Sequence, residues 1–291
     1  MIDLRYHRPA TVADACALGL QLGADAVFLA GGTELVPDYQ RGREKAVDLI
    51  ALGGIAGLRA IRTEGDFLRI GSLTTVAVLA RSPLAGERLP ALTEAARSLG
   101  SPPIRNRATV GGNFCRAVSC ADLPPAALVG DARLRIASPL GERDMPAADF
   151  FVGPRRTVLA PGELLTAVLL PAPAEHRGTA FERFALRRGL ALAVASVAAR
   201  LDFDGAVVAG AAIALGAVAP TPMLVPGAAS ILLGKRASAA LFARAADACA
   251  HAAEPISDVR GSEEFRRDIV RVLARRALAR AAARAGVEVA A

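Results

Sequence analysis

The chain has 291 residues, of which 53% are hydrophobic, and it carries a formal charge of +7. This length is enough to bury a full core and predicts two or three domains. Aromatic residues make up only 4% of the chain and Trp is absent, so surfaces on which nucleic-acid bases could stack are scarce. The basic excess gathers in the last predicted helix, where we expect a solvated face or a subunit contact. Its arginines are Arg266, Arg267, Arg271, Arg275, Arg276, Arg280 and Arg284.

The N-terminal segment predicts a small α/β unit. Thr11 is placed to cap a helix, with Asp14 three positions later, and an apolar stripe at helical spacing follows. Residues 26–30 then form a short apolar run that is typical of a buried strand, and residues 46–50, apolar except for Asp48, predict another strand. In such a unit the ligand-binding loop follows the carboxyl end of a strand, which here is the segment after residue 30.

Two glycine pairs lie about 80 positions apart, Gly31-Gly32 and Gly111-Gly112. Glycine permits positive φ and lets a ligand approach the backbone N–H groups without a Cβ in the way. A concave nest of such N–H groups binds an anion without a lysine. Two nests would therefore suit the two ends of a long phosphorylated cofactor, although each pair by itself is equally compatible with an ordinary turn.

Beyond residue 56 the pattern changes to antiparallel strands mixed with helices. Strands are predicted at 58–62, 67–71, 132–137 and 164–170, and helices at 75–80 and 89–99. Residues 171–174 are the clearest linker, and strands follow at 180–186, 193–203 and 206–218.

The C-terminal region holds two further signals. Residues 205–234 are free of charge, but glycine and proline interrupt them, which favours strands and a turn over a membrane span. The last helix is predicted to begin at Ser262, which caps it ahead of two acidic residues. Its predicted buried face consists of Phe265, Ile269, Val272, Leu273 and Ala277.

Several familiar signatures are absent. The sequence has no G-x-x-x-x-G-K-[ST], no G-x-G-x-x-G and no G-x-S-x-G, and its three histidines are scattered, so we predict no metal site. Asp3 and Arg5 interrupt any early apolar run, so no signal peptide is expected. Four isolated cysteines favour a reducing, cytoplasmic setting. Cys115 and Cys120 are more compatible with buried or half-buried thiols than with a redox or cluster role.

A series of motifs in one order adds specificity to the glycine pairs. They are Arg8-Pro9, residues 29–35, residues 70–75, Ile104-Arg105-Asn106, residues 109–113, residues 122–125, residues 153–157 with 163–165, residues 216–222, residues 257–262 and residues 275–278. Together they resemble the FAD-binding subunit of the molybdenum hydroxylases. That family includes xanthine dehydrogenase, carbon monoxide dehydrogenase, quinoline oxidoreductase and the aroyl-CoA reductases. The resemblance covers nearly the whole chain.

The resemblance implies an α+β protein with the two-subdomain FAD-binding fold of the PCMH, or vanillyl-alcohol-oxidase-like, type, followed by a C-terminal antiparallel sheet with helices. Three domains are expected: a small α/β FAD-binding subdomain at 1–55, an α+β FAD-binding subdomain at 56–172, and a subunit-docking domain at 173–291. The cysteine-bearing insertion of the aroyl-CoA reductases is missing, so we expect no extra 4Fe-4S cluster.

The resemblance also implies FAD contacts, residue by residue. The segment of Leu29, Ala30, Gly31, Gly32, Thr33, Glu34 and Leu35 matches the loop that wraps the FAD pyrophosphate with backbone N–H groups. Thr109, Gly111, Gly112 and Asn113 match the segment that grips the phosphate from the other side and borders the flavin. Asp122 matches an acidic position near the adenosine ribose, and Leu159 and Arg183 match less regular contacts with the flavin or the adenine. We expect no catalytic acid, base or nucleophile, because FAD carries the chemistry.

The expected function is electron transfer. A large subunit with the molybdopterin cofactor would oxidise the substrate, and a small subunit would pass the electrons through 2Fe-2S clusters to FAD, which would hand them to NAD, a quinone, oxygen or another acceptor. The assembly expected is a cytoplasmic dimer of heterotrimers, with no nucleic acid and no membrane span. Two alternatives stay open: a stand-alone FAD-dependent oxidase or reductase of the same wider fold, and a basic protein that binds RNA or lipid. Substrate choice would lie in the large subunit.

Overall fold

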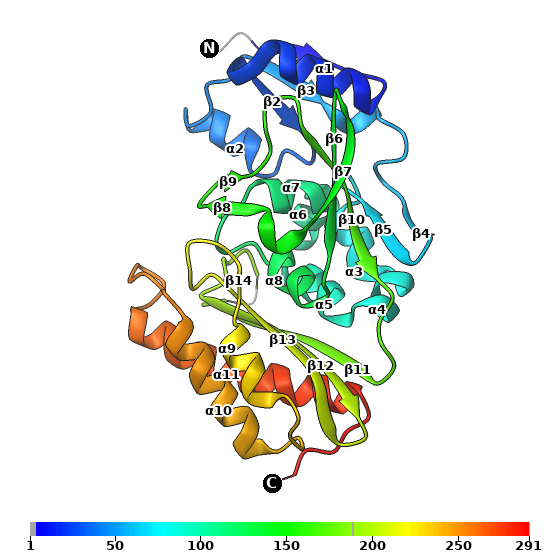
Figure 1. The fold of residues 1–291 in the computed structure, drawn as a ribbon. Helices are drawn as coiled ribbons and strands as arrows, with labels where there is room; N and C mark the ends of the chain where they lie inside the picture. The colour runs from blue at the N-terminus through cyan, green and yellow to red at the C-terminus, as the bar shows by residue number, and fades with distance from the viewer. Residues whose placement is uncertain (1–3, 188, 291) are drawn as a thin grey trace.

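The computed structural model describes residues 4–187 and 189–290. Its strands form sheets of three, five and four strands and one two-stranded hairpin, and the sheets follow one another along the molecule (Figure 1). Each of the larger sheets lies within one of the three predicted residue ranges. The division into three domains stays our interpretation.

The first sheet is a small parallel one. It contains β1 (Arg5–His7), β3 (Asp48–Ala51) and β2 (Ala26–Leu29), in the order β1-β3-β2. The predicted helix is confirmed as α1 (Val12–Leu22), and Thr11 caps it by accepting a hydrogen bond of 3.0 Å from the backbone N–H of Asp14. A 3-10 turn, η1 (Gly23–Asp25), leads into β2, and α2 (Leu35–Gln40) follows the first glycine pair.

The second sheet is antiparallel, in the order β4-β5-β10-β6-β7. Its strands are β4 (Ile61–Glu64), β5 (Phe67–Gly71), β10 (Leu164–Pro171), β6 (Arg133–Ser138) and β7 (Gly141–Pro146). The first of these begins three residues later than predicted, because residues 56–59 form a turn. The shorter elements around this sheet are η2 (Leu52–Gly54), η3 (Ala147–Asp149), β8 (Phe151–Gly153) and β9 (Arg156–Thr157).

A layer of short helices separates the second sheet from the third. Its members are α3 (Val76–Arg81), α4 (Pro83–Arg88), α5 (Pro90–Ser98), α6 (Pro102–Arg107), α7 (Val110–Cys115) and α8 (Leu123–Val129). Side chains of this layer share one core with Ile70 of the second sheet and with Phe181 and Ala198 of the third. The two larger sheets are therefore held together by a common apolar layer.

The third sheet is also antiparallel and carries its own helices on its outer face (Figure 1). Its strands are β11 (Arg177–Phe184), β12 (Ala195–Asp204), β13 (Val207–Gly216) and β14 (Met223–Leu224), in that order. The outer helices are α9 (Pro226–Leu232), α10 (Ala239–Ala252) and α11 (Glu263–Arg284). The charge-free stretch forms strands and a turn as predicted, but its last part forms α9, which was not predicted. Among the described residues no helix is both long and apolar enough to cross a bilayer.

The predicted buried face of the last helix is partly wrong. Ser262 does cap α11, and Leu273 and Ala277 are buried, but Phe265 is 40% exposed and Val272 is 37% exposed. Arg266 is buried instead, at 1% exposure. It can be buried because its guanidinium donates to the backbone oxygens of Val194 and Ala217, at 3.0 and 3.1 Å, and to Asp258 at 2.5 Å.

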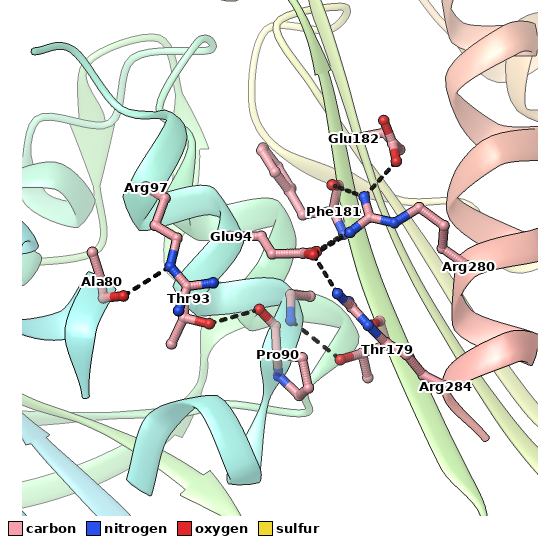
Figure 2. Close-up of polar contacts among 11 residues, drawn as sticks. Ala80, Pro90, Thr93, Glu94, Arg97, Thr179, Phe181, Glu182, Arg280 and Arg284 are labelled. Carbon is pink, nitrogen blue, oxygen red and sulfur yellow. Dashed lines mark hydrogen bonds and ion pairs between the residues drawn. The ribbon is translucent and has the colours of Figure 1, made fainter. Parts of the chain in front are cut away.

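The arginine-rich helix is also more than a solvated face. Figure 2 shows Glu94 of α5 accepting hydrogen bonds from Arg280 and Arg284 of α11. Its other carboxylate oxygen accepts the backbone N–H of Phe181 in β11 at 2.9 Å. Arg280 also donates to Glu182 at 2.5 Å. We call these four side chains (Glu94, Glu182, Arg280 and Arg284) the latch, because they tie the helical layer to the third sheet and to α11, which packs on that sheet.

Candidate functional site

The first glycine segment (residues 30–35) leaves its backbone N–H donors free. It follows β2 directly, and Gly32 adopts φ = 72°, a conformation that favours glycine. The carbonyl of Gly32 begins α2 by accepting the N–H of Val36 at 3.0 Å. Within the described chain, however, the N–H groups of Gly31, Gly32, Thr33 and Glu34 donate no hydrogen bond. Four consecutive uncommitted donors are suited to an anion.

The second glycine segment (residues 109–113) does not form a second nest of free N–H groups, so the expectation of two nests is wrong. Residues 110–115 form helix α7, which Thr109 caps by accepting the N–H of Gly112 at 3.1 Å. The N–H of Gly111 donates to the carbonyl of Ser72 at 2.7 Å, and that of Asn113 donates to Thr109 at 3.0 Å. These donors are used inside the protein, so any ligand contact here depends on the space that glycine leaves and not on free N–H groups.

Glycine does create a close approach in both segments. A Cβ on Gly31 would collide with the carbonyl oxygen of Arg107 and lie 3.1 Å from Cα of Ala108. A Cβ on Gly111 would lie 2.6 Å from Cβ of Ser72. The first segment therefore packs against the residues just before Thr109, and the second against the turn after β5. Segments far apart in the sequence meet at one junction.

The turn after β5 completes this junction. Its Thr74 carbonyl accepts the N–H of Val110 at 3.0 Å, and the N–H of Val76 donates back to Ala108 at 2.8 Å. The hydroxyl of Ser72 is buried and, among the described residues, has no hydrogen-bond partner. A free hydroxyl beside Gly111, together with the free donors of the first segment, fits a phosphorylated cofactor, because buried polar groups are normally satisfied.

Two predicted site residues bind each other. Nε of Arg183 in β11 donates to Oδ1 of Asp122 at 2.9 Å, and Arg183 also donates to the carbonyl of Ala191. Asp122 is only 4% exposed, and burial raises the pKa of its carboxyl to about 6 despite the opposing charge of Arg183. The pair lies beside α7, since the side-chain oxygen of Asn113 accepts the N–H of Leu123 at 3.3 Å.

The remaining predicted residues differ in how they are placed. Leu159 is half-buried and packs against the core between the second and third sheets. Its N–H donates to Thr157 at 3.3 Å, and among the described residues none of its hydrogen bonds reaches a glycine segment. Leu35 begins α2 and is half-buried. The structure thus brings the two glycine segments into contact and pairs Asp122 with Arg183. Leu159 forms no hydrogen bond with any of these residues.

Arg116 also belongs to this site, although no sequence motif predicts it. It follows α7 directly and forms ion pairs with Asp38 of α2 and with Glu34, the latter at 3.6 Å. The only local signal was a single cation in the otherwise uncharged run after Asn113.

The cysteines near the site also differ from one another. Cys120 is half-buried as predicted. The Cys115 residue is exposed, but its thiol is desolvated, which raises the pKa of the thiol to about 12. No group of three or more His, Cys, Asp or Glu side chains in the described part of the chain is arranged to hold a metal ion.

Comparison with known families gives two matches in chain order. Residues 2–173 match the model described as the FAD binding domain in molybdopterin dehydrogenase. Residues 180–281 match the model described as the CO dehydrogenase flavoprotein C-terminal domain.

Curated relatives match over nearly their whole length. The carbon monoxide dehydrogenase medium chain of Hydrogenophaga pseudoflava is 36% identical over 96% of this chain and 97% of its own. The putative xanthine dehydrogenase FAD-binding subunit of Escherichia coli K12 is 34% identical over 97% of each chain. The nicotine 6-hydroxylase medium subunit of Paenarthrobacter nicotinovorans is 33% identical over 97% of this chain and 98% of its own.

Solved structures show the same architecture. A chain of the carbon monoxide dehydrogenase from Hydrogenophaga pseudoflava superimposes with a TM-score of 0.93 at 36% identity, covering 97% of this chain and 98% of that one. A chain of quinoline 2-oxidoreductase from Pseudomonas putida 86 gives a TM-score of 0.91 at 29% identity, with the same coverage.

Proposed function

Since this chain belongs to the family of FAD-binding subunits of the molybdopterin dehydrogenases, we propose that it carries FAD in the electron-transfer chain of a molybdenum-containing hydroxylase. The observation that carries the proposal is the run of four uncommitted N–H groups at Gly31 to Glu34, packed against the residues that lead into α7. When bound, FAD supplies the redox chemistry, because it takes up electrons singly and releases them as a pair.

The residues of this chain would bind and orient the cofactor. The backbone of Leu29–Leu35 would hold the diphosphate, and Thr33 and Glu34 would add side-chain contacts. Thr109, Gly111, Gly112 and Asn113 would border it on the other side, where the missing Cβ of Gly111 lets α7 pack closely against Ser72. Asp122 would bind near the ribose, while Arg183 keeps its carboxylate oriented. Leu159 and Arg183 are further contacts that we propose with the flavin or the adenine.

The partners follow from the same family. Relatives are named as medium chains and medium subunits, and we propose a large subunit with the molybdopterin cofactor and a small subunit with 2Fe-2S clusters as the other members of the complex. We further propose a dimer of heterotrimers that works in the cytoplasm and delivers electrons to NAD, a quinone, oxygen or another acceptor. Substrate choice belongs to the large subunit in this scheme.

The test is a visible spectrum of the co-purified complex together with elemental analysis for molybdenum and iron. Flavin bands with iron–sulfur absorbance and molybdenum are expected. A colourless chain that takes up no FAD on reconstitution would contradict the proposal. Robust oxidation of a simple organic substrate by the isolated chain would instead favour a stand-alone oxidase.

A further inference from the structure

We propose that Arg116 is a positioning residue for FAD: it offsets the negative charge at Glu34 and fixes α2 to the end of α7, so that a diphosphate can approach the first glycine segment. This inference rests on the proposed function, because it needs FAD at that segment. The residues involved are Arg116, Glu34 and Asp38, which lie on opposite sides of the junction between the two glycine segments.

One side of the guanidinium is firmly anchored. Arg116 donates to Oδ2 of Asp38, whose residue is only 5% exposed. Its own backbone N–H donates to the carbonyl of Gly112 at 3.1 Å, at the end of α7. The next residue is held as well, since the N–H of Arg155 donates to the carbonyl of Ala117 at 2.8 Å. Arg116 therefore links α2 to a segment that is rigid at several points.

The other side of the guanidinium faces Glu34. Nε of Arg116 lies 3.6 Å from Oε2 of Glu34, which is close enough for charge pairing but too long for a hydrogen bond. That nitrogen is buried and, within the described chain, has no hydrogen-bond partner. The Glu34 side chain is 62% exposed, and in the described part of the chain Arg116 is the one cation paired with it.

The need for such a cation follows from charge. Glu34 lies within the run of free N–H groups, so we place its carboxylate beside the proposed diphosphate site. Like charges in close juxtaposition oppose binding, and ordinary salt screens them little within the Debye length of about 10 Å. Arg116 offsets the charge of Glu34 without occupying the free donors. Because Asp38 shares the same guanidinium, the three side chains together carry one net negative charge, where Glu34 and Asp38 alone would carry two. A diphosphate is therefore repelled less than it would be without Arg116.

The test measures the FAD dissociation constant of the full-length chain, stripped of cofactor and titrated with FAD. Arg116→Ala is expected to weaken FAD binding about tenfold. The matched control is Arg41→Ala, which removes an exposed cation at the end of α2 that forms no ion pair among the described residues. Binding by this control should stay within about twofold of the wild type.

A double variant separates positioning from a general structural role. If Arg116 acts by offsetting the charge of Glu34, then adding Glu34→Gln to Arg116→Ala should restore most of the lost affinity, because the repelling charge is gone. A purely structural role would not give this rescue. The idea is overturned if Arg116→Ala binds FAD like the wild type, or if Glu34→Gln has the same effect whether or not Arg116 is present.

A second pair of variants covers the case in which Arg116→Ala does not fold, since it leaves the buried carboxylate of Asp38 unpaired. The same comparison is then made in the Asp38→Asn background, where that charge is absent. A tenfold difference between Asp38→Asn and Asp38→Asn/Arg116→Ala supports the inference, and equal affinities contradict it. Failure of the wild-type chain to bind FAD would refute the proposed function itself, whatever the variants do.

Discussion

The hydrogen-bonding groups of the latch are paired within the protein, whereas the backbone N–H groups of the first glycine segment are not. At the latch, both oxygens of Glu94 accept hydrogen bonds, from Arg280, from Arg284 and from the N–H of Phe181 (Figure 2). At the glycine segment, four consecutive N–H groups donate to nothing within the described chain. Backbone N–H groups that the chain does not pair are available to water or to a ligand. The latch holds the fold together, and the glycine segment is available for binding.

The largest effect is expected at the glycine segment, from Gly31→Ala. The added Cβ would collide with the carbonyl oxygen of Arg107. The neighbouring atoms of Arg107 and Ala108 are backbone atoms, so they cannot move away as a side chain could. We expect FAD affinity to fall about a hundredfold and the free energy of unfolding to fall by about 3 kcal/mol. Cofactor titration and urea unfolding measure the two losses.

Gly227→Ala is the control for that substitution. Gly227 lies in the first turn of α9, where an added Cβ meets no atom within 4 Å. It should leave FAD affinity unchanged and raise stability slightly, since alanine favours a helix by up to about 1 kcal/mol over glycine. Normal FAD binding by Gly31→Ala would show that the two glycine segments do not need to touch.

At the latch, Glu94→Ala should affect stability and spare the cofactor. The change leaves the N–H of Phe181 without its acceptor and removes one of the acceptors of Arg280 and of Arg284, which we expect to cost about 2–3 kcal/mol of the free energy of unfolding. FAD affinity of the folded protein should stay within about twofold, because the latch residues donate nothing to the glycine segments.

Glu87→Ala is the matched control at the latch, since Glu87 is exposed and has no ion pair among the described residues. Urea unfolding should show it to lie within about 0.5 kcal/mol of the wild type. If Glu94→Ala lost FAD as readily as stability, the division between a structural and a binding region would be wrong.

Local patterns were sufficient to predict most elements of both regions. The Thr11 cap, the strand before Gly31 and the Ser262 cap each depend on a few adjacent residues, and each is confirmed. The helix after Thr109 was missed because two glycines in its first turn lower its intrinsic propensity. It forms because Thr109 caps it and because Gly111 packs closely against Ser72, a contact that no local pattern reveals.

The charged groups at the two regions were harder to predict. Arg116 and Asp38 are 78 positions apart, and Arg280 and Glu94 are 186 apart, so neither pair leaves a sequence pattern. Arg266 was placed outside the core because an arginine is rarely buried. Its acceptors are backbone carbonyls at residues 194 and 217, which only the assembled third sheet brings within reach.

A smaller, pH-dependent effect on stability is expected at Asp122. This residue bonds to Arg183, which lies on the same strand as the latch residue Glu182. Burial raises the pKa of Asp122 from 3.8 to about 6, so between these values the folded chain binds a proton that the unfolded chain has released. The stability that this proton contributes is complete below pH 3.8 and is lost as the pH rises through 6.

The expected loss between pH 4 and pH 6 is about 2 kcal/mol. It is measured as the difference in unfolding free energy between the FAD-free wild type and Asp122→Asn, because all other titrating groups are common to both. Relative to the variant, the wild type should lose stability as the pH rises over that window. A difference that stays constant with pH would mean that Asp122 is ionised throughout.

The smallest effect is expected at Cys115, next to Arg116 in the same segment. The Cys115 residue is exposed and its side chain forms no hydrogen bond in the described part of the chain, so Cys115→Ser should change stability by less than about 0.5 kcal/mol and leave FAD affinity unaltered. Desolvation raises the pKa of the Cys115 thiol and of the Cys249 thiol to about 12, so a thiol reagent should label both slowly in the folded wild type and faster after unfolding in urea. Loss of FAD from Cys115→Ser would mean that the whole segment after α7, and not the guanidinium of Arg116 alone, shapes the binding region.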